Sequence, residues 1–488
     1  MSEFAARLSS SPLRALGRDS VIYGLASMAN KALALVTFPL LARYYGAAGY
    51  GTLDLLLFAV NWAALVVIFG QDSAVARFLH EHDDDTKRAQ LVSQSLLVQL
   101  AVLLPVAGLL FALAVPAARL GGAAVDAPLL RIAALQVPAL VLLAFSQSVL
   151  RWTFQRRRFM CLSLGSVFGN AALLVVVLSQ PGHGIAAVLW IGLGVQTVFA
   201  LLGLWFIRGW LARPRGDGTL IPLLRLALPY GVVCIVAGLV PLGERSLVAL
   251  LLGSEALGLY AAGAKIAMVM ALFGFAFQSA WGPFSLAIHK AEDAAQTYST
   301  VFALVATVSA LIALVLSTLA QPLLVLLAGE QFAASSVVVL PLALGIAFQS
   351  AGWITEVGIT ISKRSYLSLY AYGVFIVFAP LCAWFLGRAY GLAGVAFGVM
   401  IGQASLALCS GWLAHRAHPV RWRLGSGLWA FAFAIAVGAA SYWAGSAFSS
   451  FAAHGVTAAG ALALAGAAWW AWQRQAETNR TTEMQARP

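Results

Sequence analysis

The sequence predicts an all-α polytopic membrane protein, and three observations lead to this prediction. The 488-residue chain is 61% hydrophobic and only 10% charged, with a mean hydropathy of +0.88. Apolar stretches of about 20 residues, the length that an α-helix needs to cross a bilayer, recur from end to end. The basic residues gather in alternate loops. This composition excludes a soluble domain, and it argues against nucleic acid as a partner although the net charge is +12.

The apolar stretches predict 14 transmembrane helices, because each runs for about 20 residues or more with few charges. Spans 1 to 6 come first, spans 7 to 12 follow, and two further spans end the chain. In this order the predicted spans are 20–42, 52–70, 89–114, 128–150, 160–179, 185–207, 226–252, 256–282, 297–320, 333–359, 366–387, 391–414, 426–445 and 451–472.

The basic residues support this count. With the N-terminus in the cytoplasm, the cytoplasmic segments hold 23 of the 30 lysines and arginines, the outer segments hold 4, and the spans hold 3. A missed or extra helix would exchange the two sides for the rest of the chain and destroy this alternation. Both termini are therefore expected in the cytoplasm, and the N-terminal segment shows no signal-peptide cleavage pattern.

The remaining residues predict no cofactor and no metal. Neither the four cysteines nor the seven histidines have metal-ligand spacing, and no nucleotide-binding motif or catalytic triad is apparent. The loops between the predicted spans are short and leave no room for a soluble catalytic domain. We therefore expect that the chain is not an enzyme.

Two similar hairpins indicate an internal repeat. Gly46 and Gly51 in the first hairpin match Gly253 and Gly258 in the second, at an offset of 207 residues. Each hairpin joins a span with an embedded cation to a span with another polar group, and both run in the same direction. This pattern predicts two six-helix lobes related by a parallel pseudo-two-fold axis, as in many transporters. The expected domains are lobes at 1–215 and 216–418, followed by two extra helices and a cytoplasmic tail at 419–488.

Four motifs carry a resemblance to a known family. They are RYYGAAGYGTLDL (43–55), FGQDSAVARFL (69–79), LGLYAAGAKIA (257–267) and AWGPF (280–284). In this order and spacing the chain resembles the polysaccharide-transport branch, with the Wzx-type O-antigen flippases, of the multidrug/oligosaccharidyl-lipid/polysaccharide flippase superfamily. Many members have twelve spans, so the predicted fourteen differ from the common pattern. The fourteen spans are also similar to those of the related peptidoglycan-precursor flippases.

Three cations embedded in the spans are candidate substrate contacts. Lys31 shares a helix face with small and polar residues, and Arg245 and Lys265 belong to the second hairpin. Counted from the outer ends of their spans, they lie about 17, 12 and 18 Å deep, so they share a similar level. Cations at one level suit a diphosphate, which arginine grips as a fork and lysine as a point charge. The alternative for Lys31 is a buried ion pair, and the alternative for Arg245 is that Glu244 or another carboxylate neutralises it.

Three carboxylates are candidates for ion coupling. Asp54 and Glu244 are the acids nearest to the level of the cations, and Glu356 lies toward the cytoplasm in span 10. An ordinary interfacial carboxylate is the alternative for Asp54. For Asp72 and Arg77, at the cytoplasmic end of span 2, helix capping and topological anchoring are the favoured interpretation.

The resemblance implies a flippase in the bacterial cytoplasmic (inner) membrane. Its substrate would be an undecaprenyl-diphosphate-linked oligosaccharide, carried from the cytoplasmic to the periplasmic leaflet for cell-surface polysaccharide such as O-antigen and lipopolysaccharide. Membrane lipids are expected as partners, together with a glycan polymerase and a chain-length regulator. The alternatives are a cation-coupled multidrug antiporter, a membrane-embedded glycan polymerase or ligase, and a scaffold without transport activity. Three embedded bases disfavour a site for cationic drugs, and the absence of a sizeable outer loop disfavours an enzyme.

Overall fold

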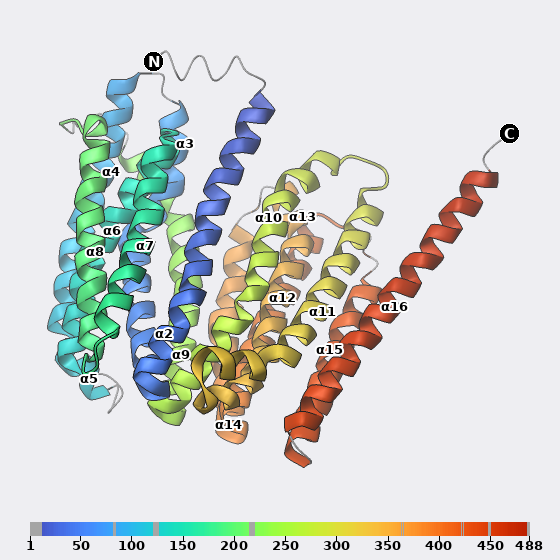
Figure 1. Cartoon of the computed structure of the whole chain (residues 1–488). Coiled ribbons are helices and arrows are strands. Elements are labelled where there is room, and N and C mark those ends of the chain that lie inside the picture. Colours follow the sequence, from blue (N-terminus) through green and yellow to red (C-terminus); the bar gives the residue numbers. More distant parts are fainter. Residues whose placement is uncertain are drawn as a thin grey trace. The chain divides into compact units, whose positions relative to one another are not determined.

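The computed structural model is helical, and the residues that it describes contain no β-strand (Figure 1). This agrees with the predicted fold class, because an α-helix satisfies its own backbone N–H and C=O groups and can therefore lie in hydrocarbon. The described residues are 12–81, 84–120, 126–213, 220–362, 364, 366–420, 422, 424–447 and 450–485.

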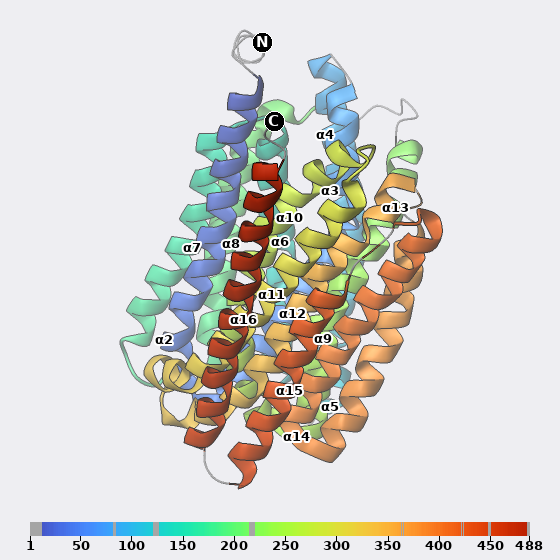
Figure 2. The same ribbon diagram turned by 90° about the vertical axis from the view of Figure 1, so that its right-hand side faces the viewer.

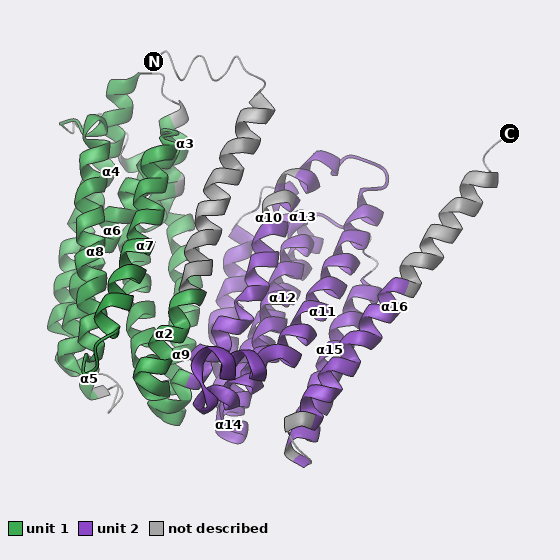
Figure 3. Cartoon of the chain, in the orientation of Figure 1, with its two compact units in different colours: residues 1–258 green, residues 259–488 purple. Residues whose placement is uncertain are grey.

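The chain forms two compact units, of which the first comprises residues 1–258 (Figure 3). This unit holds five membrane-length helices, shorter connecting helices and the beginning of α9. Its elements are α2 (Pro12–Ile68), α3 (Gln71–Glu81), α4 (Asp85–Ala112), α5 (Ala114–Leu120), α6 (Ala127–Trp152), α7 (Arg156–Leu178), α8 (Ile185–Ile207), the short η2 (Arg208–Trp210) and α9 (Leu220–Ala267) as far as Gly258.

The second unit comprises residues 259–488. After the end of α9 it contains α10 (Val269–Ile288), α11 (Ala294–Ala328), η3 (Glu330–Val338), α12 (Val339–Thr355), α13 (Val357–Ser362), α14 (Tyr366–Ala417), α15 (Gly425–Ala447) and α16 (Ser450–Gln485). The last two helices lie side by side and pack on α11 (Figure 2). The Thr318 hydroxyl of α11 donates to the Thr457 hydroxyl of α16 at 3.1 Å, so a polar contact joins the appended pair to this unit.

Eleven helices within the described residues are long and apolar enough to cross a membrane, so the chain is a multi-pass membrane protein. Two of them, with 47 and 52 residues, far exceed the roughly 30 Å of hydrocarbon if they were straight. Three of the helices contain a glycine with non-helical backbone angles, which divides each into two arms. The predicted count of fourteen includes both arms of each divided helix, and the exact number stays a prediction.

The three breaks fall at glycines with positive φ. Gly46 has φ 66° and ψ −175°, Gly253 has φ 89° and ψ 180°, and Gly391 has φ 60° and ψ −137°. Side chains rarely tolerate this region of backbone space, and glycine adopts it freely. The first two breaks coincide with the hairpins that the sequence predicts, and their similar angles support the internal repeat.

Two further pairs of glycines have the same offset as the two hairpins. Gly391 follows Gly184 by the same 207 residues, and Gly184 is the N-cap of α8. Gly329, which ends α11 with a φ of 101°, follows Gly122 by 207 residues; Gly122 lies outside the described residues. The predicted lobes, 1–215 and 216–418, divide the chain by this repeat, whereas the compact units divide it by contacts at 258; the lobes stay a prediction.

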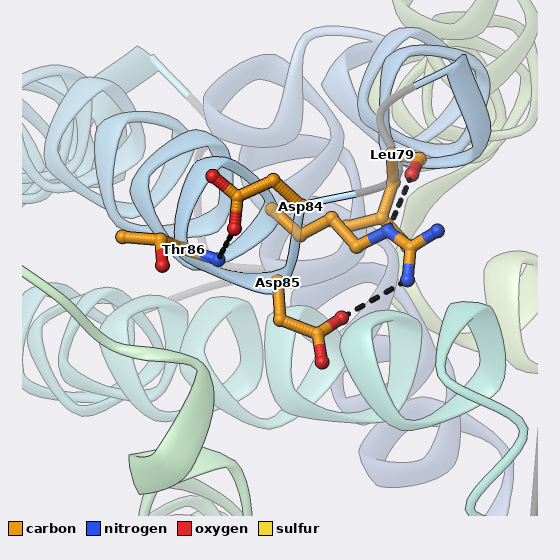
Figure 4. A network of polar contacts seen from close by, with 5 residues as sticks. Leu79, Asp84, Asp85 and Thr86 are labelled. Atoms are coloured by element: carbon orange, nitrogen blue, oxygen red, sulfur yellow. Dashed lines mark hydrogen bonds and ion pairs between the residues drawn. The ribbon is translucent and has the colours of Figure 1, made fainter. Parts of the chain in front are cut away.

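The sequence carries a run of three aspartates at 83–85, and its described members, Asp84 and Asp85, stabilise the N-terminus of α4 (Figure 4). The Asp84 carboxylate accepts a hydrogen bond from the Thr86 backbone N–H at 2.9 Å, which caps α4. Arg88 pairs with Asp85 at 3.0 Å and also donates to the carbonyl of Leu79 at 3.2 Å. These contacts tie the end of α3 to the first turn of α4, so this part of the run has a structural role.

Candidate functional site

The second arm of α2 and the first arm of α9 pack against each other in antiparallel directions within the first unit. At the hairpin end, a Cβ atom on Gly51 would overlap the backbone of Ser254 and Gly258, and one on Gly258 would overlap the Ala47 carbonyl. Glycine at these positions lets the backbones approach closely, as small residues do between membrane helices.

The same two helices also meet at the far end. The Trp62 indole N–H donates to the carbonyl of Ile235 at 3.2 Å. A Cβ atom on Gly70 would overlap the backbone at Gly231, and one on Gly231 would overlap the backbone at residue 69. We call this contact between residues 47–70 and 231–258 the α2–α9 seam.

A buried ion pair lies within the α2–α9 seam. The Arg245 Nε atom donates to the Asp54 Oδ2 atom at 2.6 Å, and each side chain is only 4% exposed. The Arg245 guanidinium also donates through an NH group to the carbonyl of Pro241 at 3.1 Å. Its central carbon lies 3.5 Å from the centroid of the Phe58 ring, in a cation–π contact. The arginine charge is thus balanced by a carboxylate, a carbonyl and an aromatic face.

This arrangement has a physical reason. An isolated charge in hydrocarbon is costly, and a buried pair is tolerated only when its geometry is good and its remaining donors find partners. The sequence left two roles open for Arg245, a substrate contact and neutralisation by a carboxylate. The structure supplies a carboxylate, that of Asp54, which lies 191 positions away in the sequence.

The other predicted site residues lie elsewhere. Lys31 belongs to α2, but its side chain lies outside the part of the chain whose side chains are described. Glu244 is half-buried in α9, and the half-buried Lys265 follows in the part of α9 that belongs to the second unit. Glu356 ends α12, and its carboxyl group hydrogen-bonds the Ser410 side chain. The common level of the three cations stays a prediction.

Asp72 belongs to a second polar cluster, with Ser148 and Arg151. From the sequence, its favoured role is that of a helix cap. It lies in the first turn of α3, and its Oδ2 atom accepts a hydrogen bond from the Ser148 hydroxyl at 2.9 Å. Ser148 in turn accepts from the Arg151 guanidinium at 3.1 Å. The Asp72 Oδ1 atom is buried and receives no hydrogen bond from the described residues. Burial raises the pKa of Asp72, and the Ser148 hydrogen bond and the Arg151 charge offset part of the rise.

A family model described as "Polysaccharide biosynthesis protein" matches residues 16–289, which is more than half of the 488 residues. No curated protein matches the chain significantly in sequence.

Solved structures with a similar fold are flippases and transporters. A structure of lipid II flippase MurJ in an inward closed conformation is similar with a TM-score of 0.71 and 14% identity, over 93% of this chain and all of that chain. A multidrug resistance MATE family transporter of the MOP superfamily, in an inward-facing conformation, has a TM-score of 0.65 and 15% identity, over 80% of this chain and 95% of that chain. A MATE protein in complex with MaL6 has a TM-score of 0.58 and 16% identity, over 83% of this chain and 97% of that chain. At these identities, the likeness shows the fold.

Proposed function

Because the chain belongs to the polysaccharide biosynthesis protein family and has the fold of flippases and transporters, we propose that it flips a lipid-linked oligosaccharide. The family and the similar folds are those of transport proteins and not of enzymes, in agreement with the sequence expectation. The proposed substrate is an undecaprenyl-diphosphate-linked oligosaccharide, moved from the cytoplasmic to the periplasmic leaflet for O-antigen or another cell-surface polysaccharide. The proposed location is the bacterial inner membrane, with both termini in the cytoplasm.

The observation that carries this proposal is the buried ion pair in the α2–α9 seam. Arg245 presents a guanidinium within a membrane-spanning helix, and its bond to Asp54 holds it in place until another anion competes. A diphosphate can replace a carboxylate as the partner of arginine, because both offer oxygens in the spacing of the guanidinium fork. In the proposed mechanism, the diphosphate replaces Asp54 as the ion-pair partner of Arg245. Lys31 and Lys265 add positive charge around the diphosphate.

Exchange of the Arg245 partner would also release the seam. Asp54 and Arg245 join two helices that touch through glycines at both ends, so the ion pair is a strong side-chain link between them. Loss of this link would allow the two helices to separate, as alternating access requires. Asp54 would then be free to take up a proton or a sodium ion, which is the coupling role expected for it; Glu244 and Glu356 remain further candidates.

Flipping of a labelled lipid-linked oligosaccharide by the purified protein in proteoliposomes tests the proposed function. Movement of unchanged substrate between leaflets supports a flippase, and a changed chain length would instead indicate a glycan polymerase or ligase. The MATE-like fold makes a multidrug antiporter the second candidate. Accumulation of a cationic dye without movement of the glycan lipid would favour that candidate and contradict the proposal.

The neutral double variant Asp54→Asn/Arg245→Gln tests whether the ion pair acts in flipping. It removes both charges together, so a purely structural pair predicts nearly unchanged transport. A diphosphate contact predicts a loss of at least about tenfold, since one charge-assisted hydrogen bond contributes more than 1.4 kcal/mol. The matched control is Asp85→Asn/Arg88→Gln, which removes an ion pair in the first turn of α4, before the predicted span 89–114, and should leave flipping unchanged.

A further inference from the structure

Asp72 lies beside a break in the helical backbone. Phe69 has a φ of 46° and Gly70 a φ of 65°, so two consecutive residues adopt the left-handed conformation between α2 and α3. A phenylalanine in this region is strained and persists only because its surroundings hold it there. Asp72 follows two residues later and forms part of those surroundings.

Three other helices converge on this break. From α4, Ser95 donates to the buried Gln71 side chain at 2.9 Å, and from α6, Ser148 donates to Asp72 at 2.9 Å. From α9, the backbone at Gly231 contacts residues 69 and 70, and Cys234 lies one turn further along. The break therefore lies at the far end of the α2–α9 seam, which we call its inner end, where residues 69 and 70 contact Gly231 and the other helices of the unit converge.

The surroundings of Asp72 favour a bound proton. Neighbouring residues of α3, Ala74 and Val75, belong to a large apolar cluster with residues of α4, α6, α8 and α9. An ionised carboxylate has room for about four hydrogen bonds, yet Asp72 receives one, from a neutral hydroxyl, among the described residues. The positive N-terminus of α3 favours the charge, but this effect is smaller than the usual cost of a buried acceptor without a partner.

Within the described residues, two titratable groups influence Asp72. Arg151 approaches from α6 through Ser148 and favours the ionised form, and Cys234 of α9 lies within electrostatic reach. α4 contributes the uncharged Ser95 at this junction. Burial of Asp72 favours its neutral form, and the nearby Arg151 charge favours its ionised form. The balance between the two forms is therefore open to change.

From these contacts we infer that Asp72 is a proton-binding site whose occupancy sets the bend at residues 69–70 and the closure of the inner end of the α2–α9 seam. A proton on Asp72 removes the buried charge, and the carboxyl group can then rest in the apolar cluster with the seam closed. Loss of the proton draws the carboxylate toward solvent and loosens the backbone that touches Gly231. A role in coupling rests on the proposed function; the proton site itself does not.

Thermal unfolding between pH 4 and pH 8 tests the site without any transport measurement. With a native pKa above the unfolded value, wild type binds more protons than the unfolded chain in the window between them, so its stability falls as pH rises through that window. Asp72→Asn mimics the neutral acid. Its melting temperature should exceed that of wild type by about 2 °C or more at pH 8, and the gap should close toward pH 4.

Matched variants show whether the effect belongs to Asp72. Asp126→Asn removes an exposed carboxylate of the same unit and should give a constant difference from wild type over this range. Ser148→Ala and Arg151→Gln remove the two influences that favour the charged form, so each should move the wild-type transition to higher pH. Parallel curves for wild type and Asp72→Asn, or no movement in the Ser148 and Arg151 variants, would overturn the proton site.

Hydrogen exchange of residues 66–75 tests the link to the bend. At pH 8 the segment should exchange faster in wild type than in Asp72→Asn, and the difference should narrow as pH falls toward 4. Equal rates at both values would contradict the link. In proteoliposomes, Asp72→Asn should flip substrate without dependence on a pH gradient. Absence of flipping in the wild type would overturn the proposed function alone, because the unfolding and exchange results do not depend on transport.

Discussion

Arg245 illustrates how a single charged residue is accommodated in a membrane-spanning helix. Its guanidinium is held by Asp54, the Pro241 carbonyl and the face of Phe58, so most of its surface meets a complementary group. Removal of one member of a buried pair leaves the other charge uncompensated, whereas removal of both leaves two neutral side chains. The pair is therefore best probed by comparing single and double changes.

The variants Asp54→Asn and Arg245→Gln should each lower the free energy of unfolding by about 3–5 kcal/mol. The double variant should lose less than either single variant, because no charge remains buried alone. Unfolding curves of the three purified proteins in one detergent measure this coupling. A double variant that loses the sum of both single effects would show that the two residues do not act as a pair.

At the scale of elements, the α2–α9 seam depends on glycine for contact and not for flexibility. The backbones of α2 and α9 touch at both ends of the seam, and a methyl group at Gly51 or Gly258 would occupy the place of backbone atoms. Backbone atoms cannot move aside as the tip of a side chain can. A small substitution at these positions must therefore push the two helices apart.

Gly51→Ala and Gly258→Ala should each destabilise the protein by about 1–3 kcal/mol, the usual cost of overpacking. Gly243→Ala is the matched control, because it lies in the same helix with open space around it and gains helix propensity. Thermal unfolding compares the three variants. If Gly243→Ala proved as harmful as the other two, the close approach would not be the cause.

Several features at this scale could be predicted from the sequence. Apolar length and basic residues predict the helices, and the matched glycines predict the hairpin breaks at Gly46 and Gly253. The partner of Arg245 could not be predicted, because helical spacing shows which face a residue occupies but not which distant helix lies opposite. The left-handed Phe69 was missed for a similar reason, since tertiary contacts hold it against its local preference.

For the whole molecule, the orientation of each span depends on the number of membrane crossings that precede it. The described part of the chain contains eleven candidate helices, and the predicted fourteen crossings depend on whether each broken helix crosses twice. A helix that is counted wrongly exchanges inside and outside for everything that follows it. Positions on both sides of α8, and beyond the break in α14, are therefore diagnostic.

Single cysteines at Gly184, Gly209 and Gly425 test this count in a variant whose four native cysteines are replaced by alanine. All three positions have open space for a side chain, and the first two lie at opposite ends of α8. A membrane-impermeant thiol reagent added to spheroplasts should label the cysteine at 184 and spare those at 209 and 425. Labelling at 425 but not at 209 would show an odd number of crossings between these positions, and it would contradict the six spans predicted there.

The constant offset of 207 residues has a consequence for the ancestry of the chain. If both copies descend from one duplicated gene, each residue has a counterpart, and the backbone breaks at Gly46 and Gly253 correspond to each other. The charged residues are not repeated at the corresponding positions. Arg245 corresponds to Phe38, Asp54 to Ala261, and Lys265 to Phe58, the ring that covers Arg245. Under this correspondence, the two halves share the glycine breaks and differ in their charged residues. The two halves of the chain can therefore respond differently to the same anion.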